Sequence, residues 1–250
     1  MKEQIDTIPV NDAFSSEDEC PFCWLERKAE QSTIRYVVGP GASYMEPDVR
    51  EVTDAVGFCT GHMQALYDYG NTLGSALILQ THYAALLKEL EAGLEDLQIP
   101  KKAGLFAKKQ PAPQETWWQH LAQKRNACFI CDRLDYHRKR YFHTFFVMLK
   151  DPEFRDKVAA SKGFCLHHFA QLMDTAETEL PKSQQQWFYD TIPAITRQNL
   201  IRVKEDLDWL IAKYDYRNAG APWKNAKDAL PRAMEKVQGF HPADPPYKNE

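Results

Sequence analysis

Six cysteines and two histidines form the pattern in this chain with the most specific chemistry. The pattern reads C-x2-C, then a long spacer, then G-F-C-x2-H, and it occurs twice, with spacers of 35 and 33 residues. Three thiolates and one imidazole in two chelating pairs are typical of a closed tetrahedral zinc site. The sequence therefore predicts two zinc ions per chain. The predicted ligands are Cys20, Cys23, Cys59 and His62 in the first copy and Cys128, Cys131, Cys165 and His168 in the second.

Two other uses of these cysteines are weighed against zinc. An iron–sulfur cluster is the main alternative cofactor, but cysteine normally supplies all four of its ligands and histidine is the exception. Reactive redox thiols or a disulfide framework would not require a histidine at the fourth place of both copies. Four protein ligands also leave no coordination position for water, which favours structural over catalytic metal.

The sequence leaves open how the ligand pairs combine. Because the two spacers match, we expect each C-x2-C to meet the G-F-C-x2-H of its own copy. Pairing across the copies, with Cys20 and Cys23 meeting Cys165 and His168, is the alternative. In the second copy His168 is preferred over His167 as the ligand, because Gly61 occupies the corresponding place in the first copy.

The duplication extends beyond the metal ligands. An acidic residue and a proline precede each G-F-C-x2-H, in Glu46-Pro47-Asp48-Val49-Arg50-Glu51 and in Asp151-Pro152-Glu153-Phe154-Arg155-Asp156. Self-similarity at this period indicates two copies of one structural unit. We predict a first unit at 1–97, a surface linker at 98–116 that is rich in proline and lysine, and a second unit at 117–250 with a C-terminal helix and tail.

The hydrophobic periodicity predicts an all-α fold of tandem helical units. Apolar residues at helical spacing predict helices at about 23–38 and 131–149, short helices opened by Pro47 and Pro152, and a long helix at 62–96. Two further helices are expected, one ending near 180 and one at about 192–214. Ser16 and Glu19 resemble a capping box before the first cysteine pair. Each ion should then lie at two helix N-termini, where free backbone N–H groups favour thiolates.

Composition places the chain among ordinary globular proteins. Hydrophobic residues make up 44% and charged residues 26% of its 250 residues, well away from the disordered class. The net charge of −4 argues against general nucleic-acid binding. No apolar run is long enough for a membrane span, and Met1–Glu19 is charged and has no signal-peptide core. We therefore expect a cytoplasmic protein with reduced cysteines.

The doubled motif, with the tail segments Lys213–Asn218 and Asp228–Arg232, resembles an uncharacterised family. It is a domain-of-unknown-function family of mainly anaerobic bacteria and archaea, and the resemblance covers nearly the whole chain. It implies that the eight metal ligands are the defining positions of the family. It implies no activity and no substrate.

Three functions are compatible with the sequence. The favoured one is a zinc-stabilised protein, not an enzyme, that binds an unknown protein or small-molecule partner. The alternatives are an iron–sulfur or thiol redox protein, and an enzyme with a polar pocket between the repeats that uses Arg217, Asp215 and Tyr216. No catalytic residue is assigned. Aromatic and arginine side chains anchor many interfaces, and the candidate partner-binding residues of the tail are Asp215, Tyr216, Arg217, Trp223 and Arg232.

Overall fold

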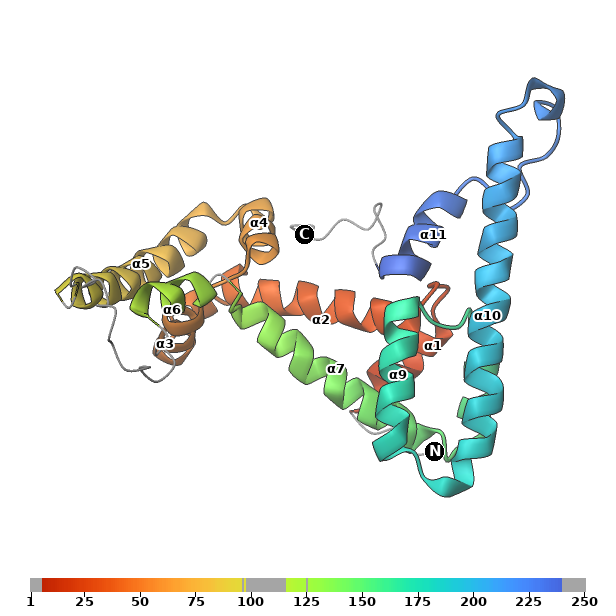
Figure 1. Ribbon diagram of the computed structural model, residues 1–250, viewed down its shortest axis with the longest axis horizontal. Coiled ribbons are helices and arrows are strands. Elements are labelled where there is room, and N and C mark those ends of the chain that lie inside the picture. The colour runs from red at the N-terminus through yellow and green to blue at the C-terminus, as the bar shows by residue number, and fades with distance from the viewer. Residues whose placement is uncertain (1–5, 96, 98–115, 125, 240–250) are drawn as a thin grey trace, which may run out of the picture. The chain divides into compact units, whose positions relative to one another are not determined.

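The computed structural model describes residues 6–95, 97, 116–124 and 126–239 (Figure 1). All regular structure in these ranges is helical, which confirms the predicted all-α fold. The α-helices are α1 Thr7–Ser15, α2 Pro21–Val38, α3 Pro47–Val56, α4 Thr60–Tyr69, α5 Thr72–Glu95, α6 Trp117–Lys124, α7 Phe129–Met148, α8 Pro152–Ala160, α9 Leu166–Glu179, α10 Lys182–Ala212 and α11 Ala229–Gln238. Two 3₁₀ turns, η1 Ser43–Met45 and η2 Tyr216–Asn218, complete the list.

The chain divides into two compact units that do not follow the two sequence copies. Unit 1 contains the residues up to Ala29 and those from Leu134 onward, and unit 2 runs from Glu30 to Arg133. Each unit therefore combines parts of both copies. The predicted linker at 98–116 lies, except for Thr116, outside the described residues.

Unit 1 has an aromatic core. Phe14 stacks on Phe145 with ring centroids 5.5 Å apart and meets Phe154 edge-on at 5.2 Å. Phe22 lies 5.9 Å from Phe164, the phenylalanine of the second G-F-C element. Around this core α8 contacts α1 and α10, while α11 packs against α9 and α10. The core thereby holds the first C-x2-C beside the second G-F-C-x2-H.

Unit 2 is built around α5, which contacts α3 and α4. The single long helix predicted for 62–96 is two helices, because Gly70 ends α4 with φ of +86°, a conformation that favours glycine. At the other end of α5, Gly93 lies against the Trp117 ring so closely that a Cβ would come within 2.4 Å of it. This contact holds α6 against α5.

The short helices opened by proline are confirmed. Pro47 and Pro152 each occupy the first position of their helix, α3 and α8, where the missing N–H has no consequence. Arg50 and Arg155, which align in the doubled motif, make the same contact: each Nε donates to a backbone carbonyl six residues earlier, at 2.7 Å and 2.6 Å. The local structure before each G-F-C element is thus equivalent.

Three features were not predicted correctly. Helices α1 and α11 were missed, and α10 begins ten residues earlier than expected, passing through Pro193. The capping-box prediction is wrong: Ser16 ends α1, and its hydroxyl donates to the Ala13 carbonyl at 2.7 Å. Glu19 is instead only 3% exposed and takes part in a buried ion cluster described below.

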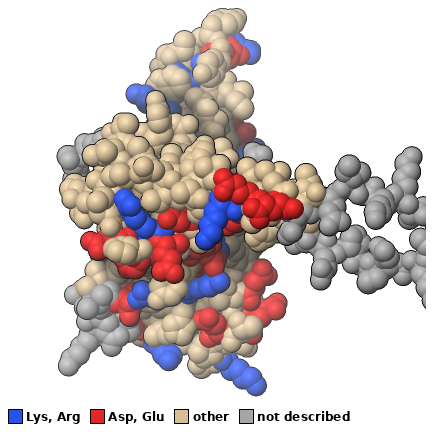
Figure 2. Space-filling model, turned by 90° about the vertical axis from the view of Figure 1, so that its left-hand side faces the viewer, with Lys and Arg blue, Asp and Glu red and all other residues tan. Residues whose placement is uncertain are grey.

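Charged side chains of both signs are interspersed on the face shown in Figure 2. Lysines and arginines lie beside aspartates and glutamates there, without an extended region of one sign. None of the helices in the described ranges combines the length and the apolar character needed to cross a membrane.

Candidate metal sites

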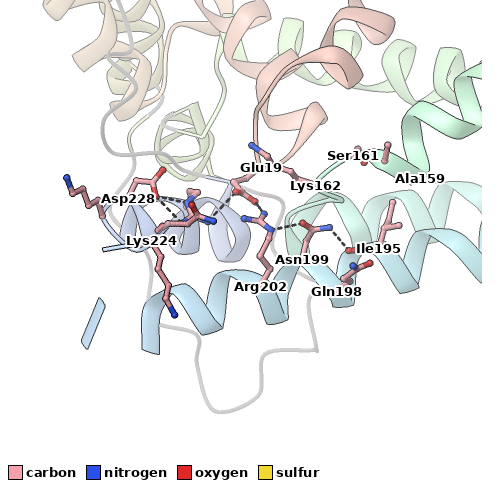
Figure 3. A pocket seen from close by; sticks show the side chains of 14 residues that line it. Glu19, Ala159, Ser161, Lys162, Ile195, Gln198, Asn199, Arg202, Lys224 and Asp228 are labelled. Atoms are coloured by element: carbon pink, nitrogen blue, oxygen red, sulfur yellow. Dashed lines mark hydrogen bonds and ion pairs between the residues drawn. The ribbon is translucent and has the colours of Figure 1, made fainter. Parts of the chain in front are cut away.

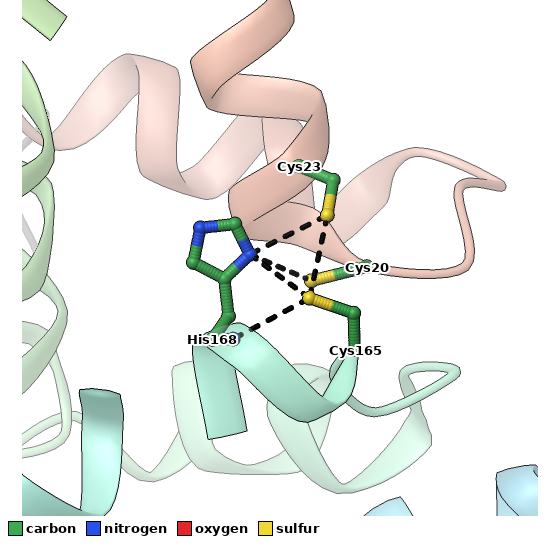
Figure 4. A group of neighbouring side chains, drawn as sticks. All are labelled: Cys20, Cys23, Cys165 and His168. Atoms are coloured by element: carbon green, nitrogen blue, oxygen red, sulfur yellow. Dashed lines mark hydrogen bonds between the residues drawn. The ribbon is translucent and has the colours of Figure 1, made fainter. Parts of the chain in front are cut away.

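Site A brings the first C-x2-C to the second G-F-C-x2-H (Figure 4). Cys20 directly precedes α2 and Cys23 lies in its first turn, while Cys165 is the N-cap of α9. The Nδ1 atom of His168 faces the three thiol groups, 3.5 Å from Cys20 Sγ, 3.4 Å from Cys23 Sγ and 3.2 Å from Cys165 Sγ. All four residues are buried.

Site B is made in the same way from the remaining ligands. Cys59 is the N-cap of α4, and Cys128 directly precedes α7. His62 Nδ1 lies 3.3 Å from Cys59 Sγ, 3.2 Å from Cys128 Sγ and 3.3 Å from Cys131 Sγ. Cys131 is exposed and Cys59 is half-buried, so site B is more open to solvent than site A. The expectation of two helix N-termini at each site is met.

The structure corrects the predicted pairing: both sites form across the copies. The reason is the length of the helices that follow each cysteine pair. With 18 residues, α2 carries the chain about 27 Å away from Cys20 and Cys23, whereas the ten residues of α3 span only about 15 Å. The second copy has the same imbalance, with 20 residues in α7 and 9 in α8. Each spacer is therefore poorly suited to returning to its own cysteine pair.

The distances between donors fit a single four-coordinate ion. Cys23 Sγ lies 3.6 Å from Cys165 Sγ, and Cys59 Sγ lies 3.8 Å from Cys131 Sγ. A tetrahedral zinc ion with Zn–S bonds near 2.3 Å has sulfur–sulfur edges of about 3.8 Å, whereas a disulfide would require about 2.05 Å. All four donor atoms of each site lie within 4.8 Å of one another. The residues present therefore fit one metal ion at each site.

A glutamate on α2 orients each histidine. His168 Nε2 lies 3.2 Å from Glu26 Oε1, and His62 Nε2 lies 3.2 Å from Glu30 Oε1. A carboxylate at Nε2 fixes the tautomer that leaves Nδ1 for the metal. Sequence reasoning missed both glutamates, although Glu26 follows Cys23 by three residues and so shares its helix face. That spacing could have identified it.

The protonation of the ligands is strongly coupled at site B. Burial alone would lower the pKa of His62, but its contacts with Cys128 and Glu30 outweigh burial and raise the pKa to about 10. Burial would raise the pKa of Cys128, yet the His62 imidazolium lowers it to about 6. Without metal, the site thus holds a thiolate–imidazolium pair.

The thiolate charge is unevenly shared at site A. Hydrogen bonds from Cys20 and Cys23 lower the pKa of Cys165, and hydrogen bonding with Cys165 raises that of Cys23. Burial opposes protonation of His168, but its contacts with Cys165, Cys20 and Glu26 raise its pKa well above the ordinary value. Protons must therefore leave both sites when a metal ion enters.

The glycine of each G-F-C element is required by the backbone. Gly57 and Gly163 have φ of +71° and +72°, a region that residues with a Cβ rarely occupy. A Cβ on Gly57 would also come within 2.8 Å of the His82 ring. His82 is itself buried and its Nδ1 lies 2.9 Å from the Asp54 carbonyl, so it packs against the metal-binding turn and is not among the donors of site B.

The two sites differ in how their two ligand segments are joined. At site B the Phe129 N–H donates to the Gly57 carbonyl at 3.0 Å. The corresponding residue at site A is Pro21, which has no N–H. There the buried ammonium of Lys236, on α11, donates to the carbonyls of Glu19 and Lys162, one on each ligand segment. Lys236 thus supplies the connection that Pro21 cannot make.

The C-terminal candidate residues do not form one site. Tyr216 is 86% exposed, and Arg217 is exposed with its guanidinium paired to Asp215 at 2.5–3.0 Å. Trp223 lies under the Lys213 ammonium, 5.1 Å from its ring centre. Arg232 is only 9% exposed and belongs to the buried ion cluster around Glu19. The first four therefore lie at the end of α10 and in the segment that follows it, while Arg232 has a structural position on α11.

The fold and the sites define a helical protein with two Cys3His groups that could each hold a metal ion. The chain belongs to a family of unknown function (DUF6062), which matches residues 1–244. It is similar to the "Uncharacterized 23.9 kDa protein in xynA 3'region" of Caldicellulosiruptor sp. (strain Rt8B.4), with 21% identity over 203 residues, 81% of this chain and 85% of that protein. No solved structure matches it. The family confirms the resemblance drawn from the motifs and carries no activity over to this chain.

Proposed function

We propose that this protein holds two structural zinc ions in closed Cys3His sites and acts by binding a partner. The observation that carries the proposal is the spacing of the donors, since the four donor atoms of each site lie within 4.8 Å of one another. This is the size of the coordination sphere of one ion. An iron–sulfur cluster places several irons and sulfides between its ligands and would hold them farther apart.

The position of the sites in the chain supports a structural role. Cys23 and Cys165 are 142 residues apart in sequence, and Cys59 and Cys131 are 72 apart. An ion bound by such ligands would cross-link distant segments, and its binding free energy would become folding free energy. With four protein ligands no position is left for a water molecule. Recognition of a partner is therefore a better-supported role than chemistry at the metal.

We also propose that the chain is internally duplicated and works in a reducing compartment such as the cytoplasm. The equivalent contacts of Arg50 and Arg155 support the duplication. All six cysteines are free, and clustered thiols that bind metal are typical of reducing compartments. For the partner, exposed Tyr216 and Arg217 at the end of α10 are candidate contacts.

Elemental analysis tests the metal assignment. Protein purified anaerobically, without added metal or chelator, should contain two zinc ions per chain and no acid-labile sulfide. Cobalt substituted for zinc should give the intense visible absorption of tetrahedral thiolate coordination. Iron together with labile sulfide would establish the cluster alternative, and a metal content below one per chain would contradict both assignments.

A further inference from the structure

A polar cavity of about 730 Å³ opens in unit 1 (Figure 3). Its size falls in the range of small-molecule sites, roughly 300–1,000 Å³. None of the eight metal ligands lines it. Its walls come from the end of α8, the middle of α10, the segment 224–228 and the start of α11, with Glu19 contributing from before α2. It is thus a site assembled from parts of the chain that are distant in sequence.

Positive charge predominates in the lining. Five basic side chains face two acidic ones, Glu19 and Asp228, so the lining carries an excess of three positive charges. This contrasts with the net charge of −4 for the whole chain. The five basic residues are Lys162, Arg202, Lys224, Lys227 and Arg232.

The two arginines account for both acidic residues. Arg232 donates to Asp228 at 3.0 Å, to Asp206 at 3.0 Å and to a backbone carbonyl. Arg202 donates to Asn199 at 2.9 Å and to Glu19 at 2.5 Å. These bonds form a fixed inner wall with little remaining charge of either sign.

The three lysines carry the excess charge. Lys162 pairs with Glu17, whose side chain is 95% exposed. Lys224 lies over the Trp209 ring, 4.8 Å from its centre. Lys227 is exposed and makes no hydrogen bond or ion pair within the described chain. Their ammonium groups are therefore the ones able to meet a ligand.

The backbone at Lys224 is unusual. Its φ of +52° is in the left-handed region, which residues with a Cβ occupy at a cost. Glycine or asparagine would relieve this strain. The neighbouring segment is held in place, since the Trp209 Nε1–H donates to the Pro222 carbonyl at 3.0 Å and Ala226 is fully buried. The fold thus fixes a lysine at a position that suits glycine better.

We propose that this cavity binds a small, multiply charged anion of the phosphate-ester class. Lys162, Lys224 and Lys227 would supply the charges that meet it. Lysine binds phosphate as a point charge, and one phosphate ester group carries nearly two negative charges at neutral pH, so a bisphosphate matches three lysines well. The proposal gives a chemical class to the bound partner and does not depend on which metal occupies the Cys3His sites.

Calorimetric titration of the full-length, metal-loaded protein tests the proposal. The probes are glucose 1,6-bisphosphate, as the phosphate ester, and tricarballylate, as a polycarboxylate, at matched ionic strength. Saturable one-site binding of the bisphosphate is expected, with at least tenfold weaker binding of tricarballylate. Equal or tighter binding of tricarballylate would overturn the phosphate assignment, and absence of saturable bisphosphate binding would overturn the site.

Variants separate binding from folding. Lys227→Ala should weaken bisphosphate binding about fivefold, the loss of one charge contact worth about 1 kcal/mol in water. Lys224→Gly should weaken it similarly while keeping or raising the melting temperature, because glycine relieves the left-handed strain. Lys204→Ala is the matched control, since Lys204 lies on α10 outside the cavity and pairs with Asp208 at 2.6 Å. Equal weakening by Lys204→Ala and Lys227→Ala would show a general charge effect and contradict the site.

Discussion

At the scale of single residues, a carboxylate behind each histidine distinguishes these sites from a chance cluster of thiols. Glu26 and Glu30 each lie 3.2 Å from the Nε2 atom of their histidine, which leaves Nδ1 toward the thiols. Such outer partners raise ligand basicity and fix the ring. Their contribution can be measured one site at a time, because each glutamate serves a different histidine.

Glu30→Gln should lower metal affinity at site B by about tenfold, the lower end of the effect usual for such partners, and leave site A unchanged. Glu26→Gln should do the reverse. Competition with a chromogenic chelator, which resolves the two metal equivalents, measures both. Glu89→Gln is the control, because Glu89 pairs with Lys124 away from the ligands. Equal weakening of both equivalents by Glu30→Gln would contradict the assignment.

The protonation of His62 leads to a prediction about pH. Contacts with Cys128 and Glu30 raise its pKa to about 10 in the metal-free protein, and burial raises the pKa of Cys131. At neutral pH both groups hold a proton that the metal must displace. Affinity at site B should therefore rise with pH between about pH 6 and pH 8, with release of about two protons per metal ion. Metal titrations in weakly buffered solution measure the protons; binding without proton release would show that the thiolates and imidazole are already deprotonated.

At the scale of helices, local sequence patterns predicted most of the elements and missed those with weak local signals. The apolar spacing after each cysteine pair predicted α2 and α7, and Pro47 and Pro152 marked the starts of α3 and α8. The segment of α11 has a proline at its third position and charged residues on one side, so its pattern alone did not indicate a helix. Its importance comes from tertiary contacts of Lys236, which no local pattern contains.

Helix α11 should be needed for metal retention at site A. Lys236→Met keeps the aliphatic stem but removes the ammonium that joins the Glu19 and Lys162 carbonyls. Leaving buried acceptors unsatisfied should lower the free energy of unfolding by about 2 kcal/mol, and metal should leave site A faster than in the unsubstituted protein. Stopped-flow release to a chelator, together with thermal melts, measures both. Lys139→Met, at an exposed lysine of α7, is the control. Equal acceleration at both sites would rule out a specific role for Lys236.

At the scale of the whole chain, the central feature is the exchange of ligand pairs between the copies. The eight ligand positions were predicted from spacing alone, because chelation constrains neighbours in sequence. Their pairing was not, because the two C-x2-C elements are locally alike and so are the two G-F-C-x2-H elements. Which half meets which is decided by helix lengths and by packing such as that of Phe22 on Phe164. These are properties of the assembled fold.

Cysteine labelling in two single-substitution variants tests this crossed pairing most directly. Pulsed alkylation followed by peptide mass spectrometry reports the reactivity of each thiol. In Cys59→Ser, the account predicts that Cys128 and Cys131 become reactive while Cys20, Cys23 and Cys165 stay protected in the intact site A. In Cys165→Ser, Cys20 and Cys23 should become reactive instead. If Cys59→Ser exposes Cys20 and Cys23 and leaves Cys128 and Cys131 protected, the ligands pair within each copy and the crossed arrangement is wrong.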